Sequence, residues 1–258
     1  MFKFRKRITP LQEQIILATG CGLLIVSVIL FSALYCIKEL NNKALKKDYA
    51  NLAIKDPYQI EEVINLSDKK YLDTLGKEGI VYYDDGVGMN SVDSVLNAYT
   101  KLPDDLKRLV EGTGFKVKLS QFLDDVDGVT YYGDKVILIE EFGDDLTLTT
   151  FHEFGHVVNV LGYIENGRNR LEKCYATENK LYHGTMRDYI ISSPSEYYAG
   201  SFVEYMLDSD KLKRERPMTF KMIDDDVKSL KDVRVKEASD MFGSYLPLKE
   251  LKESDLRN

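Results

Sequence analysis

The chain has 258 residues, of which 44% are hydrophobic and 30% charged, with a formal net charge of −7. This length allows one or two domains, and the hydrophobic fraction is sufficient for a packed core. The acidic balance argues against a general nucleic-acid-binding protein, whose surface would carry a basic patch, so no nucleic-acid partner is expected.

An uncharged run lies near the start of the chain. Residues 15–37 contain no charged side chain and are long enough to cross a bilayer as one helix. The end of the run, residues 34–37, is a poor site for signal cleavage, so we expect an uncleaved anchor; a cleaved signal and a lipoprotein are the alternatives. The preceding tail, residues 1–14, is short and basic, and such tails usually stay in the cytoplasm. We therefore expect a single-pass protein of the cell membrane with most of its residues outside the cell.

The rest of the chain divides into a polar, Lys-rich stalk or linker at residues 38–57 and one domain at residues 58–250. Strand patterns occur at residues 80–83, 115–119, 129–132 and 135–140, and the last two form a predicted hairpin around Gly133-Asp134. Helices are predicted at residues 67–75, 91–101, 104–111, 144–161, 168–181, 193–209 and 217–230, with Gly76, Gly112 and Gly162 ending three of them. Strands followed by helices indicate an α+β fold.

The predicted helix at 144–161 contains His152-Glu153-Phe154-Gly155-His156, an H-E-x-x-H motif. Histidines four residues apart lie on one face of a helix, about one turn apart, so both imidazoles can reach a single zinc ion. Glu153 can activate a zinc-bound water for attack on a peptide carbonyl. The chain has only three histidines, and this motif contains two of them. Two unrelated surface histidines on an ordinary helix are the alternative.

A catalytic zinc needs a third protein ligand and an open position. The metzincin pattern is excluded, because Asn159 and Gly162 occupy the places where that longer motif needs glycine and histidine. Spacing alone leaves several downstream carboxylates open: Glu165, Glu172, Glu178, Glu196 and Glu204. The third histidine, His183, is interpreted as a surface or core residue, and a substrate-binding residue of the cleft is the alternative.

The segment Ser195-Glu196-Tyr197-Tyr198-Ala199, downstream of the H-E-F-G-H sequence, resembles the zinc metallopeptidases related to anthrax toxin lethal factor, a family that includes Pro-Pro endopeptidases. Tyr189 precedes this segment at the place of the family's tyrosine, and residues 218–223 resemble the start of its last helix. The resemblance spans about residues 100–230. It implies a zincin-type domain, with a small mixed sheet, an active-site helix and C-terminal helices.

The resemblance also implies one catalytic Zn²⁺, with Glu196 as its third ligand and Tyr189 facing the ion. Two imidazoles and one carboxylate leave the ion a net positive charge, which acidifies its water. Glu153 then acts as general base, and the Tyr189 hydroxyl can stabilise the oxyanion. Many family members carry a second glutamate at the position of Gly200, so here any such support must come from another group, for which Glu204 is a candidate.

These observations predict a membrane-anchored, zinc-dependent endopeptidase that hydrolyses peptide bonds of a protein or peptide substrate. Residues 136–139 are expected to pair with an extended substrate, unless that strand is interior. A catalytically silent zinc-binding interaction module of the same fold is the alternative, although every position that the chemistry needs is filled. The sequence specifies neither the preferred bond nor the oligomeric state.

Overall fold

The computed structural model describes residues 62–121, 123, 126–167 and 169–247. The predicted basic tail, membrane helix and stalk lie outside these residues. Within the described ranges, none of the helices is both long and apolar enough to cross a membrane.

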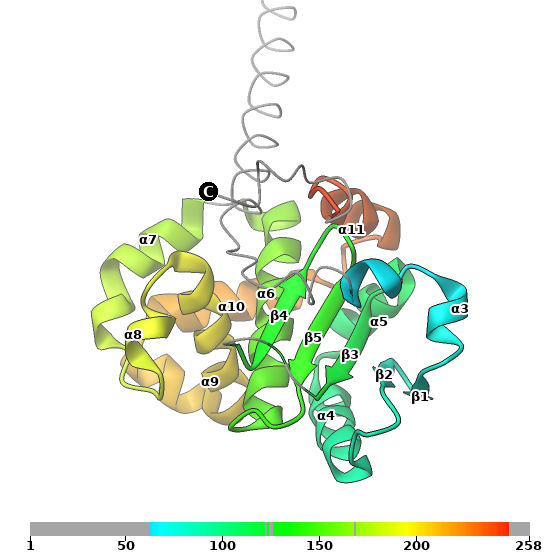
Figure 1. The fold of residues 1–258 in the computed structure, drawn as a ribbon. Coiled ribbons are helices and arrows are strands. Elements are labelled where there is room, and N and C mark those ends of the chain that lie inside the picture. Colours follow the sequence, from blue (N-terminus) through cyan, green and yellow to red (C-terminus); the bar gives the residue numbers. More distant parts are fainter. Residues whose placement is uncertain (1–61, 122, 124–125, 168, 248–258) are drawn as a thin grey trace, which may run out of the picture. The chain divides into compact units, whose positions relative to one another are not determined.

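The fold is a mixed α+β arrangement built on one five-stranded sheet (Figure 1). The strand order is β1-β2-β3-β5-β4, in which β2, β3 and β5 run parallel, and β1 and β4 pair antiparallel at the two edges. The bounds are Gly76–Glu78 for β1, Val81–Tyr83 for β2, Lys116–Ser120 for β3, Gly128–Tyr131 for β4 and Val136–Glu140 for β5. The predicted hairpin is therefore confirmed as β4 and β5.

The strand order corrects the expectation that residues 136–139 pair with a substrate. Strand β5 lies between β3 and β4 and hydrogen-bonds with both, so its backbone groups are already used within the sheet. Strand β4 has only β5 beside it among the described strands, and its other side forms the edge of the sheet. An extended peptide could add to β4 but not to β5.

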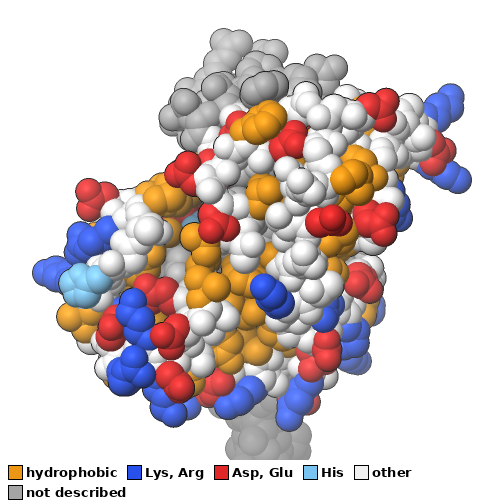
Figure 2. Space-filling model, turned by 90° about the horizontal axis from the view of Figure 1, so that it is seen from below, with side chains coloured by type: hydrophobic (Ala, Val, Ile, Leu, Met, Phe, Trp, Pro, Cys, Tyr) orange, Lys and Arg blue, Asp and Glu red, His pale blue; other side chains and the backbone are white. Residues whose placement is uncertain are grey.

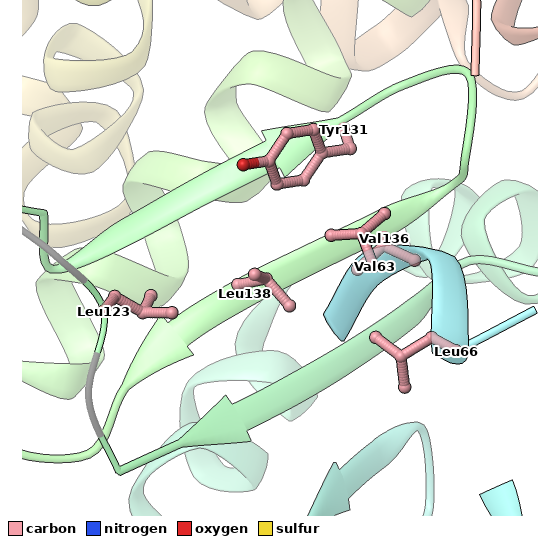
Figure 3. Packing of buried hydrophobic residues seen from close by; sticks show 6 residues of the cluster. All are labelled: Val63, Leu66, Leu123, Tyr131, Val136 and Leu138. Carbon is pink, nitrogen blue, oxygen red and sulfur yellow. The ribbon is translucent and has the colours of Figure 1, made fainter. Parts of the chain in front are cut away.

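One face of the sheet is covered by the segment that begins the described part of the domain. Val63 and Leu66 pack over Tyr131, Val136 and Leu138, and Leu123 completes this buried cluster (Figure 3). Side chains alternate along a strand, so the neighbouring residues of β5, which are also buried, face the opposite side of the sheet. A strand that is apolar on both faces is typical of the interior of a covered sheet.

Helix α6 connects the sheet with the helical part of the domain. It contacts β4 and β5 as well as α9 and α10, and Figure 1 shows α7 to α10 beyond the β4 side of the sheet. The helices are α3 Lys69–Leu72, α4 Met89–Lys101, α5 Asp104–Thr113, α6 Leu146–Asn166, α7 Asn169–Glu178, α8 Arg187–Ile190, α9 Pro194–Glu215, α10 Pro217–Ser229 and α11 Val235–Phe242, with a 3₁₀ turn η1 at Asn179–Leu181.

Two predicted helix ends were wrong, and for the same reason. Helix α5 continues past Gly112 and ends at Gly114, whose φ is +84°, and α6 continues past Gly162 and ends before Gly167, whose φ is +72°. These two end residues adopt positive φ, which favours glycine, whereas Gly112 and Gly162 are helical and lie against other side chains.

The predicted helix at 67–75 was too long at both ends. Helix α3 covers only Lys69–Leu72: it begins after Asp68, which caps it by accepting a hydrogen bond from the Lys70 amide, and it ends before Asp73, its C-cap. Gly76 begins β1 instead of ending a helix. The short helices α8 and α11 were not predicted at all.

Candidate metal centre and active-site cavity

The start of α6 places one stripe of its side chains on a cavity. Asp145 caps the helix, and its carboxylate accepts hydrogen bonds from the amides of Thr147 and Leu148 at 2.9 and 3.1 Å. Residues three and four apart share a helix face, which brings His152 and Glu153 onto the same cavity as Asp145 and Leu148.

Helix α9 brings Glu196 to the histidines. Ser193 caps this helix by accepting a hydrogen bond from the Glu196 amide, and Pro194 occupies its first turn. The two helices approach closely at Gly155, where an added Cβ would lie 2.9 Å from the Cα of Ala199. Gly155 and Ala199, the small residues of the two sequence motifs, thus permit a close contact between α6 and α9. This contact brings Glu196, in the first turn of α9, beside His152 and His156.

The side chains of His152, His156 and Glu196 form a group that could hold a metal ion, since one ligand atom from each lies within 4.8 Å of the others. The Nε2 atoms of the histidines are 3.2 Å apart, and Glu196 Oε2 lies 3.0 Å from His152 Nε2 and 3.5 Å from His156 Nε2. A tetrahedral zinc with bonds of about 2.0–2.1 Å holds its ligand atoms about 3.3–3.4 Å apart. The donor set and its spacing therefore fit zinc.

Ser195 supports this group from outside, a contact that the sequence analysis missed. Its Oγ lies 3.2 Å from His156 Nδ1, the ring nitrogen that does not face the other ligands. A hydrogen bond at that nitrogen fixes the orientation of the ring and its tautomer. The only signal in the sequence was the position of Ser195 next to Glu196.

The suggested supporting role of Glu204 is wrong. Its carboxylate pairs with Arg216, a buried guanidinium that lies over the rings of Tyr182 and Tyr197 at 4.9 and 5.2 Å. Gly200 has no room for a larger residue, because an added Cβ would lie 2.6 Å from Ile190 Cγ2.

Glu153 is the buried carboxylate of the cavity, with only 3% of its surface exposed. Its Oε2 accepts a hydrogen bond of 2.7 Å from Thr130 Oγ1 on β4. Burial raises the pKa of Glu153, and the charges of His156 and His152, together with the Thr130 hydrogen bond, partly oppose this increase.

The pKa values of Glu196 and His156 are shifted because these two side chains and His152 lie so close together. Burial opposes ionisation of Glu196, but the nearby His156 and His152 outweigh it and hold the pKa of Glu196 well below its ordinary value. Burial also lowers the pKa of His156, and the Glu196 carboxylate reverses that effect and raises it overall. A metal ion bound between these side chains would displace any proton from the ligand atoms of the histidines and Glu196, because metal binding and protonation compete for the same atoms.

Tyr189 lies at the same cavity, on α8. Its ring centroid is 6.1 Å from that of His152, and 48% of its surface is exposed. Partial burial raises its pKa, and the negative charges of Glu196 and Glu153 add to that increase. The residue before α8, Met186, has a φ of +49°, which is uncommon for a residue other than glycine and often marks functional sites.

The cavity has a volume of about 350 Å³ and lies between the loop before β4, the start of α6, and helices α8 and α9. Val126, Met186 and Tyr189 line it and are also among the exposed hydrophobic residues of the domain. Figure 2 shows hydrophobic side chains gathered in the middle of one face, with most charged side chains around them. A cavity with apolar walls and a few polar groups at one end is typical of a binding site.

The other candidate residues lie elsewhere. Glu165, Glu172 and His183 are exposed and do not line the cavity. Glu178 is buried, but it accepts hydrogen bonds from the amides of Met218 and Thr219 at the start of α10. Geometry thus separates Glu196 from the carboxylates that spacing alone left open.

Comparison with known protein families gives no match, and no curated protein matches the chain. Among solved structures, the Pro-Pro endopeptidase PPEP-2 from Paenibacillus alvei is similar, with 19% identity and a TM-score of 0.47, over 57% of this chain and 96% of that one. An identity and a TM-score this low carry no argument about function. The resemblance to the lethal-factor-like family therefore stays a prediction.

Proposed function

We propose that the chain is a zinc-dependent endopeptidase whose domain at residues 58–250 hydrolyses peptide bonds of a protein or peptide substrate. The observation that carries the proposal is the convergence of His152, His156 and Glu196, because His152 lines the same cavity as Glu153. Two imidazoles and one carboxylate are a common ligand set of catalytic zinc, and they leave a position open for chemistry.

Each residue has a physical role in this reaction. A bound zinc would supply Lewis acidity, which polarises the peptide carbonyl and acidifies water. The buried Glu153 carboxylate accepts a proton from the attacking water and then passes it to the leaving amine. The Tyr189 hydroxyl is protonated at neutral pH, as an ordinary tyrosine is, and its raised pKa keeps it so at higher pH; it can therefore hydrogen-bond the oxyanion that forms on the carbonyl.

Substrate binding is proposed along the edge of β4. Gly128 belongs to this strand and lines the cavity, so a peptide added to the edge would pass close to Glu153. Backbone hydrogen bonds to a strand edge bind an extended peptide with little dependence on its sequence, while the cavity would accept a side chain.

We further propose that residues 15–37 anchor the chain in the cell membrane with the catalytic domain outside. The uncharged run and the basic tail before it support this orientation. Fusions of the C-terminus to a reporter that is active only in the cytosol test it. Activity of that reporter would show that the domain is inside the cell.

The function is tested with the full chain, by measuring its zinc content and its cleavage of a mixed peptide library. We expect about one zinc per chain, and cleavage that is lost on chelation and restored by zinc. Glu153→Gln should keep its zinc and its fold but lose activity, because the amide cannot accept the proton. A wild-type chain that binds zinc and cleaves no peptide or protein would instead indicate a silent binding module, and a chain without zinc would remove the metal from the proposal.

A further inference from the structure

Strand β4 presents two different faces to the domain. Side chains alternate along a strand: Tyr131 belongs to the hydrophobic cluster on one side of the sheet (Figure 3), and Val129 packs against that cluster. Gly128 and Thr130 therefore point to the other side, where β4 contacts α6. The strand at the sheet edge thus packs into the core with one face and against the active-site helix with the other.

Thr130 makes its contacts with Glu153. Its Oγ1 lies 2.7 Å from Glu153 Oε2 and 3.3 Å from the Glu153 carbonyl oxygen. Thr130 is 4% exposed and Glu153 is 3% exposed, so water does not compete for this bond. An ionised carboxylate can only accept, and the threonine hydroxyl has a single hydrogen, which it donates along the shorter contact.

The absence of a side chain at Gly128 leaves room for the other carboxylate oxygen of Glu153, Oε1. An added Cβ at Gly128 would lie 3.0 Å from Glu153 Oε1 and 2.8 Å from Thr149 Cγ2. Both Gly128 and Glu153 line the cavity. One oxygen of Glu153 is therefore held by β4, while the other lies beside a glycine that leaves room at the cavity.

We propose that Thr130 is a positioning residue for the general base. The proposal rests on the proposed function, because it assigns that role to Glu153. Thr130 holds Oε2 in place, which fixes the side-chain torsions of Glu153 and directs Oε1 toward the substrate. Catalytic groups must keep their geometry to a fraction of an ångström, and a buried hydrogen bond to the far oxygen does this without entering the reaction.

The test compares Thr130→Val, which keeps the shape but loses the hydroxyl, with Thr130→Ser, which keeps the hydroxyl. The matched control is Thr150→Val, because Thr150 is a buried threonine of α6 whose hydroxyl donates to the Leu146 carbonyl of the same helix. All are measured in the full chain at equal zinc content. We expect Thr130→Val to lower kcat about 10–100-fold. KM should change by less than about threefold, because the lost contact acts on the chemical step.

Rescue by the conservative variant separates positioning from packing. Thr130→Ser and Thr150→Val should both keep kcat within about threefold of the wild type. If Thr130→Val is as active as the wild type while Glu153→Gln is inactive, the positioning role is overturned and the proposed function stands. If Thr130→Ser is as impaired as Thr130→Val, the methyl packing matters instead of the hydroxyl, and the proposal is equally overturned.

A structural readout decides the matter even if no substrate is cleaved. Crystal structures of the wild type and of Thr130→Val should show the Glu153 carboxylate in one position in the former, and displaced or in several positions in the latter. An unchanged carboxylate in Thr130→Val would overturn the proposal independently of activity.

Discussion

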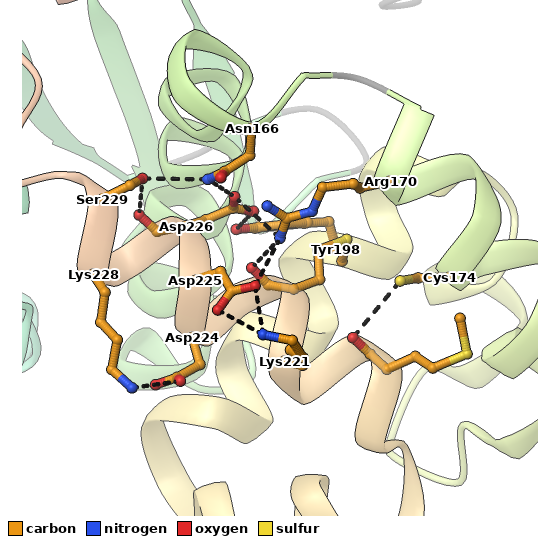
Figure 4. Close-up of polar contacts among 12 residues, drawn as sticks. Asn166, Arg170, Cys174, Tyr198, Lys221, Asp224, Asp225, Asp226, Lys228 and Ser229 are labelled. Carbon is orange, nitrogen blue, oxygen red and sulfur yellow. Dashed lines mark hydrogen bonds and ion pairs between the residues drawn. The ribbon is translucent and has the colours of Figure 1, made fainter.

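One buried carboxylate, Glu153, is part of α6, and another, Asp226 of α10, lies against the same helix; only Glu153 belongs to a candidate active site. Glu153 is 3% exposed, Asp226 is 5% exposed, and burial raises the pKa of both. Near Asp226, Asn166 donates to Oδ1 at 2.8 Å, Tyr198 donates to Oδ2 at 3.0 Å, and Arg170 lies 3.5 Å away (Figure 4). Asp226 thus has partners at both oxygens, whereas Glu153 borders a cavity beside a metal-ligand group.

The comparison shows that burial and a raised pKa do not by themselves mark a functional carboxylate. Structural networks of hydrogen bonds and ion pairs also perturb pKa values. The polar network around Asp226 joins α6, α7, α9 and α10, so it stabilises the packing of these helices. Access from a cavity and convergence with other reactive groups distinguish Glu153.

The largest expected effect comes from changing the ligand on α9. Glu196→Gln removes the charged ligand, and we expect zinc affinity to fall by more than about 100-fold, since even outer partners of metal ligands are worth about 10–100-fold. Cleavage should be lost with the metal. Competition with a fluorescent zinc chelator measures the affinity.

Glu204→Gln is the matched control, because Glu204 lies on the same helix but pairs with Arg216. It should lower the thermal stability, since the buried Arg216 guanidinium loses its charged partner and keeps only neutral ones such as Ser201, and it should leave zinc affinity unchanged. Equal losses of affinity in the two variants would mean that Glu196 is no more a ligand than Glu204.

A second strong effect is expected at Tyr189. Tyr189→Phe removes the proposed donor to the oxyanion, and such a donor is typically worth about 10²–10³-fold in kcat. Tyr205→Phe is the control, because that hydroxyl bonds Asp224 on α10. Steady-state kinetics should show a loss of kcat at similar KM for Tyr189→Phe alone. An increase in KM at unchanged kcat would mean that Tyr189 binds the substrate and takes no part in the chemical step.

The sequence predicted the reactive residues better than their surroundings. The H-E-x-x-H motif places its histidines by helix geometry alone, since i and i+4 share a face. Glu196 could not be chosen by spacing, because its position depends on how α9 packs against α6 at Gly155 and Ala199. Only the resemblance to a known family singled it out.

Contacts between distant elements were the part that pattern reading missed. The hairpin was predicted, but the strand order was not, and it is this order that makes β4 the edge and β5 interior. The contact between Thr130 and Glu153 follows from that order. The alternation of Gly128 and Thr130 with two apolar residues was the available signal, and it shows which residues share a face but not what that face meets.

The next prediction concerns the pH dependence of stability at Asp226. Burial raises its pKa from 3.8 to about 6, so between these values the folded protein binds a proton that the unfolded chain does not. Stability from this group is therefore present at low pH and is lost as the pH rises from about 4 to about 6, by up to about 3 kcal/mol. Asp226→Asn lacks this titration and should gain stability relative to the wild type over that range.

Urea unfolding of both chains from pH 4 to pH 8 measures the difference. Because other groups titrate equally in the two chains, only the difference between the curves is informative. Parallel curves would show that Arg170 and the hydrogen bonds keep the carboxylate ionised in the folded state. Peptide cleavage at pH 8 should be similar in the two chains, because Asp226 lies outside the cavity.

The smallest expected effect lies where α6 meets Asp226. An added Cβ at Gly162 would lie 2.6 Å from Asp226 Cγ, and this short side chain is held by its partners. Gly162→Ala gains about 1 kcal/mol of helix propensity but overpacks the contact at a cost of about 1–3 kcal/mol. We expect a net loss of about 1 kcal/mol in the free energy of unfolding.

A double-mutant cycle isolates the contact from the propensity. In an Asp226→Ala background the alanine at position 162 has space, so Gly162→Ala should there become stabilising by up to about 1 kcal/mol. The same loss in both backgrounds would mean that the crowding at Gly162 comes from another group. If the effect of Gly162→Ala on the free energy of unfolding changes sign between the two backgrounds, Asp226 is held by close packing against α6 as well as by hydrogen bonds. Glu153 differs, because Gly128 leaves space beside its carboxylate.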